Sequence, residues 1–210
     1  MTDSMTSIRN DSGFRKDWYR KSASAFRWLH IYLSMLGFGA ILFFAVTGIT
    51  LNHPTWLGGS EQHVEDLSGE FSVEWLQNDP GDLEIAETLR ERHRLKGRVK
   101  EFESDEYEYM LVYKSPGYAA DVFIDRETGK YSLTVSSSNL VAVMNDLHKG
   151  RDSGPVWNVL VIDGSAVLML LFSLSGFALL LYIKRHRRTG LITAVVGTLL
   201  IFGVWIWWTP

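Results

Sequence analysis

The chain has 210 residues, of which 46% are hydrophobic and 21% charged, with a formal net charge of −3. By length and composition alone it would fit one or two soluble domains, and without a general basic excess it is not expected to bind nucleic acid. The absence of cysteine excludes disulfides, thiolate metal sites and covalently attached c-type haem.

The distribution of charge is more informative than its total. Residues 28–60, 164–183 and 191–210 contain no Asp, Glu, Lys or Arg. About 20 apolar residues suffice for a helix to cross ~30 Å of hydrocarbon. The first stretch is too long for a signal peptide, and no small-residue cleavage site follows it. The sequence therefore predicts three transmembrane helices, at residues 24–53, 156–184 and 191–210.

The charges that flank these stretches predict the topology. The segment up to Trp28 holds six basic and three acidic residues, and the loop at 185–190 is basic, so both are expected in the cytoplasm. Residues 1–23 are then a cytoplasmic tail, which we expect to be disordered through residue 17. Between His53 and Leu147 there are nineteen acidic and nine basic residues, a net charge of −10, which fits an extracytoplasmic domain.

The expected extracytoplasmic domain covers residues 54–137 and has an α+β pattern. It opens with a glycine-containing loop, continues with a helix at 82–95, and then shows short β-rich stretches at 99–103, 107–113, 119–124 and 131–135. Residues 138–155 form the junction to the second span, with a short helix at 139–149 for which Ser136 to Ser138 offer a cap. We predict a helix packed on a small antiparallel sheet.

Four of the six histidines lie at the ends of membrane segments. His30 and His186 fall on the cytoplasmic side, and His53 and His148 on the outer side. Imidazole is a common axial ligand of haem iron, so one pair on each side would hold two b-type haems, and one or two haems are expected in all. His63 and His93 lie among charged residues of the soluble domain, and we assign them no ligand role.

Three of these four histidines also have an interpretation that does not involve a ligand. His30, beside Arg27, fits an interfacial residue, and His53 before Pro54 fits a helix stop. His148 is followed by Lys149, Gly150 and Arg151. The cations of Lys149 and Arg151 suit haem propionates, and so does the cation of Arg27. His186 lies in a basic run that orientation alone explains. Zinc is the alternative metal, but a structural zinc site needs four converging nitrogen or sulfur ligands.

Two groups of residues carry a resemblance to a known family. Trp28-Leu29-His30 with Thr47-Gly48-Ile49-Thr50-Leu51-Asn52-His53, and Asp146 to Gly154 with the helix that follows, resemble PepSY-associated transmembrane proteins. Ser175-Gly176 stands where that family usually has Thr-Gly. The resemblance implies an extracytoplasmic PepSY domain inserted between membrane helices of the bacterial inner membrane, with the large loop and the C-terminus in the periplasm. Larger relatives are haem-containing ferric-siderophore reductases with more spans.

The resemblance, together with the histidines, leads to the hypothesis of a haem b electron-transfer protein that passes electrons outward, plausibly to ferric iron. Two haems would require a homodimer or a membrane partner subunit, because three helices enclose little volume. No flavin or nicotinamide motif is present, so the electron donor is another molecule. Two alternatives stay open: a non-enzymatic PepSY module that inhibits a peptidase or senses a ligand, and an accessory subunit that docks through Gly37, Gly39 and Gly48.

Overall fold

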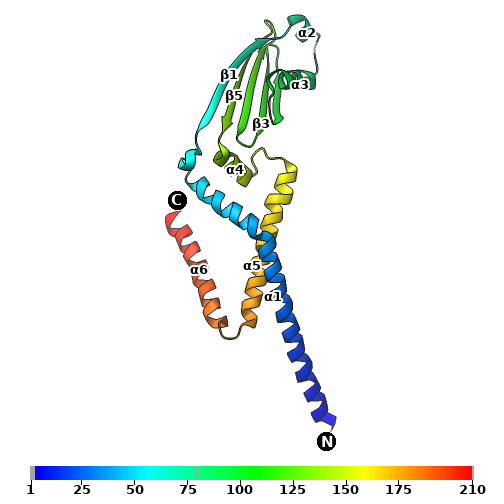
Figure 1. The fold of residues 1–210 in the computed structure, drawn as a ribbon, viewed down its shortest axis with the longest axis vertical. Helices are drawn as coiled ribbons and strands as arrows, with labels where there is room; N and C mark the ends of the chain where they lie inside the picture. The colour runs from blue at the N-terminus through cyan, green and yellow to red at the C-terminus, as the bar shows by residue number, and fades with distance from the viewer. Residues whose placement is uncertain (1–2, 79, 210) are drawn as a thin grey trace. The chain divides into compact units, whose positions relative to one another are not determined.

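The computed structural model describes residues 3–78 and 80–209 of the chain (Figure 1). The elements are α1 (Asp3–Asn52), η1 (Trp56–Gly58), β1 (Gln62–Glu70), α2 (Val73–Gln77), α3 (Asp82–His93), β2 (Arg98–Ser104), β3 (Glu108–Ser115), β4 (Tyr118–Asp125), β5 (Lys130–Ser138), α4 (Leu140–Lys149), η2 (Trp157–Asp163), α5 (Gly164–Tyr182) and α6 (Arg187–Trp208). Two compact units result. One holds the chain up to Ile41 and from Gly164 onward, the other Leu42–Asp163.

Three helical segments are long and apolar enough to cross a membrane. They cover Asp17–Asn52, Trp157–Tyr182 and Arg187–Trp208, each with a mean hydropathy of 2.0 or 2.1. Among the described residues of α6 none is buried, which is the pattern of a helix whose surroundings are apolar on all sides. The three predicted membrane helices are thus present by length and composition.

Two of the predicted helix boundaries are wrong. The disordered segment predicted over residues 1–17 is helical from Asp3 onward, because α1 begins there; residues 1 and 2 lie outside the described part. No proline precedes Pro54, so no strong helix breaker stops α1 from extending. Helix α6 begins at Arg187 and not at 191, since arginine is a good helix former. Pro210 lies outside the described residues.

The second unit is built on one antiparallel sheet, with strand order β1-β5-β4-β3-β2 (Figure 1). Alternate residues of the strands point to one face and are fully buried there, among them Leu111, Val122 and Leu133. Ile85 and Leu89 of α3, also fully buried, complete this core. The predicted helix on a small antiparallel sheet is therefore correct, and β2 to β5 follow the four predicted strands closely.

The sheet has a fifth strand where a loop was expected. Strand β1 pairs along its whole length with β5, from Gln62 opposite Ser138 to Glu70 opposite Lys130. Most of its residues are exposed and polar, so it lacks the apolar alternation that marks a strand in a sequence. Helix α2 also falls in the expected loop.

Helix α4 follows the predicted helix at 139–149, but its cap differs from the predicted one. The side chain of Asn139 accepts a hydrogen bond from the backbone N–H of Ala142 at 3.1 Å, which makes Asn139 the N-cap. Ser136 to Ser138 belong to β5. At the other end Gly150 adopts a left-handed conformation (φ 68°), and a side chain there would collide with Asn158.

Candidate functional site

His30 lies on α1 and contacts three residues of α5. Its Nδ1 atom is 3.0 Å from Oγ of Ser175, and its ring stacks on Phe172 at 4.8 Å between centroids. Gly176 provides the space for the ring: a Cβ atom there would lie 2.9 Å from Cε1 of His30. We call these four residues the His30 site. Ser175 is 97% buried, so its hydroxyl is shielded from solvent.

The hydrogen bonds of Ser175 are compatible with one tautomer of His30 in particular. The carbonyl oxygen of Phe172 lies 2.8 Å from the hydroxyl and can accept its proton. With the proton donated there, the oxygen accepts from His30, and Nδ1 of His30 is the donor. The second ring nitrogen, Nε2, is left with a lone pair. This is the form in which a histidine binds a metal, with its other nitrogen held by a hydrogen bond.

His148, near the end of α4, repeats this arrangement against the last turns of α1. Its Nδ1 atom is 2.6 Å from Oγ1 of Thr47, and its ring meets that of Phe44 edge-on at 5.0 Å. Gly48 lies beside Cε1. Thr47 is also 97% buried and donates its proton to the carbonyl oxygen of Phe43 at 2.6 Å. These contacts define the His148 site, and with the Thr47 proton on the carbonyl they too are compatible with a proton on Nδ1 and a lone pair on Nε2.

Two further contacts hold α4 in place. Oγ1 of Thr50, one turn beyond Thr47, donates to Oδ1 of Asn145, one turn before His148, at 2.6 Å. The indole nitrogen of Trp157 donates to the carbonyl oxygen of Leu147 at 2.9 Å. The imidazole of His148 is therefore fixed by its own hydrogen bond and by contacts on either side of it.

The pKa of His148 is lowered from its ordinary value. Burial is the larger cause, and the positive charge of Lys149 adds to it. Both favour the neutral imidazole, which is the form that can bind a metal ion.

The two sites share a short sequence pattern on the helix that receives the histidine. It reads Phe44-Ala-Val-Thr47-Gly48 in α1 and Phe172-Ser-Leu-Ser175-Gly176 in α5. In each, the hydroxyl lies within hydrogen-bond distance of Nδ1, the glycine lies beside the ring and the phenylalanine packs on it; only at Gly176 would a Cβ atom crowd the ring. Sequence reasoning missed these partners. The repeated pattern is the signal that would have found them, but five residues are too few to stand out before the contacts are known.

The remaining predicted site residues have different surroundings. His53 stacks on Trp56 at 3.9 Å between centroids, and His186 is exposed at the N-cap position of α6. Arg27 and Lys149 are exposed, and neither has an ion-pair partner within the described chain. Arg151 lies 3.6 Å from Asp146, whose other oxygen accepts the N–H of Gly117 at 2.9 Å. The cation of Arg151 is thus already paired.

Of the three glycines of α1 named for docking of a partner subunit, two have a neighbour within the described chain. Gly37 lies near Leu168 of α5, and Gly48 lies near His148. At Gly39 a Cβ atom would meet nothing within 4 Å in the described part of the chain. In residues 3–78 and 80–209, no group of three or more His, Cys, Asp and Glu side chains is placed to hold a metal ion. The ligand chemistry these sites offer is therefore a single oriented imidazole each.

The fold and the sites define a membrane protein with three candidate spans, a small antiparallel domain encoded between the first two, and two helix-packed histidines. The model of a protein family described as Putative PepSY_TM-like matches residues 24–210 of the chain. The chain belongs to this family, which confirms the resemblance drawn from its motifs. No curated protein and no solved structure matches the chain.

Proposed function

We propose that this protein is a membrane electron-transfer protein in which Nε2 of His30 and Nε2 of His148 are axial ligands of haem b. When bound, haem b supplies one-electron transfer through its iron. The protein's part is to hold the ligand nitrogens deprotonated and correctly aimed. The proposal rests on two hydroxyl groups, those of Ser175 and Thr47. Each can donate its proton to a backbone carbonyl oxygen and accept a hydrogen bond from Nδ1 of the facing histidine.

This hydrogen bonding fits the needs of a haem ligand. A ligating histidine must present an unprotonated nitrogen, and the hydrogen bond on its other nitrogen fixes the tautomer and the ring orientation. Ordinary interfacial histidines have no need of a buried hydroxyl and a facing glycine. The chain supplies both twice, on different helices, and this repetition favours ligation over a purely structural role.

A six-coordinate iron needs a second axial ligand. His186 and His53 are proposed for this position next to His30 and His148 respectively, as is the same histidine of a second copy of the chain. A homodimer or a membrane partner subunit would also supply the volume that three helices lack. Arg27 and Lys149 are proposed as propionate partners, while Arg151 would have to leave Asp146 to act as one.

The proposed direction of electron flow combines the topology with the family resemblance. The basic residues near the first and second spans predict a cytoplasmic N-terminus and an extracytoplasmic large loop. The resemblance implies that the membrane is the bacterial inner membrane, that the loop lies in the periplasm and that electrons pass outward. Electrons from a cytoplasmic or membrane donor would then reach an extracytoplasmic acceptor, with ferric iron or a ferric siderophore as the proposed acceptor class.

The test is spectroscopic. The full chain is purified in mild detergent after expression with ample haem, and its oxidised and dithionite-reduced visible spectra are recorded with a pyridine haemochrome assay. Reduced bands of a b-type haem, at one or two haems per chain, support the proposal. A colourless protein overturns it and leaves a PepSY binding or regulatory module as the working function.

A further inference from the structure

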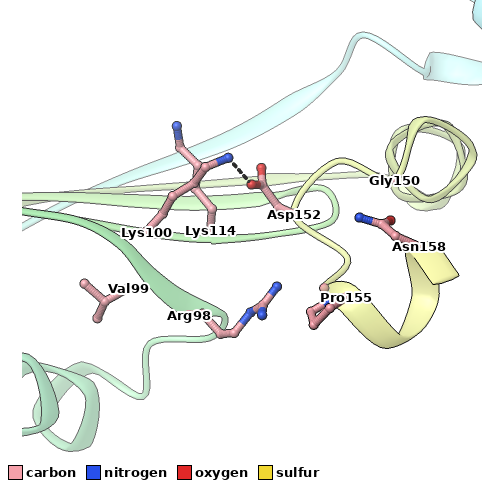
Figure 2. A pocket seen from close by; sticks show the side chains of 9 residues that line it. Arg98, Val99, Lys100, Lys114, Gly150, Asp152, Pro155 and Asn158 are labelled. Atoms are coloured by element: carbon pink, nitrogen blue, oxygen red, sulfur yellow. Dashed lines mark hydrogen bonds and ion pairs between the residues drawn. The ribbon is translucent and has the colours of Figure 1, made fainter.

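The second unit contains a positively charged cavity that the proposed function does not use. It has a volume of about 430 Å³ and is lined by nine residues, Arg98, Val99, Lys100, Lys114, Gly150, Asp152, Gly154, Pro155 and Asn158. That volume lies within the ~300–1,000 Å³ usual for small-molecule sites. Figure 2 shows Arg98 extending from β2 toward the loop at Pro155 and Lys100 paired with Asp152.

The charge of this cavity is opposite to that of its domain. Three of the nine basic residues between His53 and Leu147 line it, in a segment whose net charge is −10. Among the described residues that line it, the one acid is Asp152, which lies 2.5 Å from Nζ of Lys100. Arg98 and Lys114 have no ion-pair partner in the described part of the chain, so two positive charges remain uncompensated there.

The sheet register sets these two cations side by side. Arg98 and Lys114 are direct partners across the antiparallel β2–β3 pair, where like charges repel and destabilise the sheet. The register shifts between Val99 and Glu101, so Lys100 is the extra residue of a β-bulge, a feature that redirects a side chain. A bound anion would relieve the repulsion between the two cations.

The loop opposite the sheet is shaped to admit Arg98. Gly154 has a φ of 91°, which a side chain rarely adopts, and a Cβ atom there would lie 3.0 Å from Nη2 of Arg98 and crowd the guanidinium. Oδ1 of Asn158 accepts a hydrogen bond from Ser153 at 3.0 Å, which leaves the amide nitrogen as a donor. The cavity therefore offers a guanidinium, an ammonium and an amide to one ligand.

We propose that this cavity binds the phosphate group of an anionic phospholipid. Guanidinium and ammonium groups recognise phosphate oxygens through charge-assisted hydrogen bonds. The candidate span Trp157–Tyr182 begins between Pro155 and Asn158, which both line the cavity, so the cations lie next to the start of a membrane segment. Basic pockets beside membrane helices bind lipid head groups in other membrane proteins, there on the cytoplasmic side, and the same phosphate chemistry is available here. A soluble phosphate ester shares the chemistry and is the other source to be tested.

The experiment uses the full chain in detergent with equal amounts of phosphatidylglycerol and phosphatidylcholine, and counts retained lipids by native mass spectrometry. The variant Arg98→Gln/Lys114→Gln removes both uncompensated cations. Arg94→Gln/Lys96→Gln is the matched control, since it removes two exposed charges from the same domain. We expect wild type and control to prefer phosphatidylglycerol, and the cavity variant to lose that preference by about tenfold or more.

The effect of inorganic phosphate on thermal unfolding distinguishes a phospholipid from a soluble phosphate ester as the ligand. If phosphate stabilises wild type and control but not the cavity variant, and no lipid preference is seen, the cavity binds an anion that is a soluble ligand and the lipid assignment is overturned. If the cavity variant and the control behave alike with both probes, the proposal is overturned. Should the double variant fail to fold, each single substitution is tested in the same way. The haem spectrum should be unchanged throughout, which separates this proposal from the ligand role of the histidines.

Discussion

The Nδ1 atom of His30 lies 3.0 Å from the hydroxyl oxygen of Ser175, whose proton is donated to the carbonyl oxygen of Phe172. His148 and Thr47 stand in the same relation at the end of α4. A hydroxyl on a neighbouring helix therefore engages Nδ1 of each histidine, and Nε2 is the nitrogen that this hydrogen bond leaves for a ligand. Testable consequences for both sites follow from this arrangement and from the glycine beside each ring.

Ser175→Ala should weaken haem binding without removing the ligand itself. The substitution leaves the Nδ1–H group of His30 without its acceptor, and loss of such a supporting hydrogen bond typically costs about 10–100-fold in metal affinity. Haem loss is measured by transfer to excess apomyoglobin. Ser173→Ala is the control, since the Ser173 hydroxyl is exposed and bonds only to Met169. Equal rates of haem loss in both variants would contradict the role given to Ser175.

Gly176→Ala and Gly48→Ala should have unequal effects. A Cβ atom at Gly176 would lie 2.9 Å from Cε1 of His30, so the ring must move, whereas at Gly48 the distance to Cε1 of His148 is an ordinary 3.9 Å. Overpacking of this kind costs about 1–3 kcal/mol. We expect Gly176→Ala to reduce haem content and thermal stability, and Gly48→Ala to retain both.

Gly197→Ala serves as the control for a helix glycine, because in the described structure nothing lies within 4 Å of a Cβ atom at that position. It should be neutral or slightly stabilising, by up to about 1 kcal/mol. If Gly176→Ala resembles Gly197→Ala, the close packing of His30 on α5 is wrong.

The pKa of His148 predicts a loss of stability in acid. Burial and Lys149 lower this pKa, so the folded protein holds the imidazole neutral while the unfolded chain protonates it below about pH 6.5. The stabilisation is complete above that pH and is lost as the pH falls through the lower, folded value. The pKa of His93 is lowered as well, by burial and by Arg92, and acts in the same direction.

The thermal midpoint of the full chain, purified without haem, should therefore fall between about pH 7 and pH 5, and that of His148→Gln should fall less steeply than that of wild type. His63→Gln is the control, since His63 is exposed on β1. Parallel curves for His148→Gln and wild type would rule out the predicted contribution.

Tyr113→Phe should destabilise the antiparallel domain by about 1 kcal/mol. The buried hydroxyl of Tyr113 donates to the carbonyl oxygen of Ala86 at 2.8 Å and so ties β3 to α3. Burial raises the pKa of Tyr113 to about 12, so its contribution is present below pH 10 and is lost as the pH rises toward 12. Tyr107→Phe, on a 77% exposed side chain, should change thermal unfolding little. Equal midpoints for the two variants would contradict this role.

Much of the fold could be predicted from the sequence because its signals are local. Strands β2 to β5 and helix α3 have apolar residues at the spacing of their elements, and charge-free stretches mark the spans. Strand β1 was not predicted, because it is held as a strand by its pairing with β5 and its own residues show no apolar alternation. The start of α1 at Asp3 was not predicted, because the polar composition of this segment was interpreted as a sign of disorder.

The candidate site was predictable only in part. His30 and His148 are marked by their positions at the ends of apolar segments, which a single sequence shows. Their partners Ser175 and Thr47 belong to other helices, and only packing brings them within hydrogen-bond distance. Arg151 was predicted as a propionate partner from its neighbours in sequence, but it lies beside Asp146, an ion pair that the spacing alone does not reveal.

The most direct test of the ligand assignment is the haem content of His30→Ala and His148→Ala, compared with His63→Ala, by pyridine haemochrome assay on purified full-length protein. Each ligand variant should lose the haem of its own site and the double variant should lose all of it, while His63→Ala keeps the wild-type value. Wild-type haem content in His30→Ala and His148→Ala alike would contradict the assignment of these histidines as ligands.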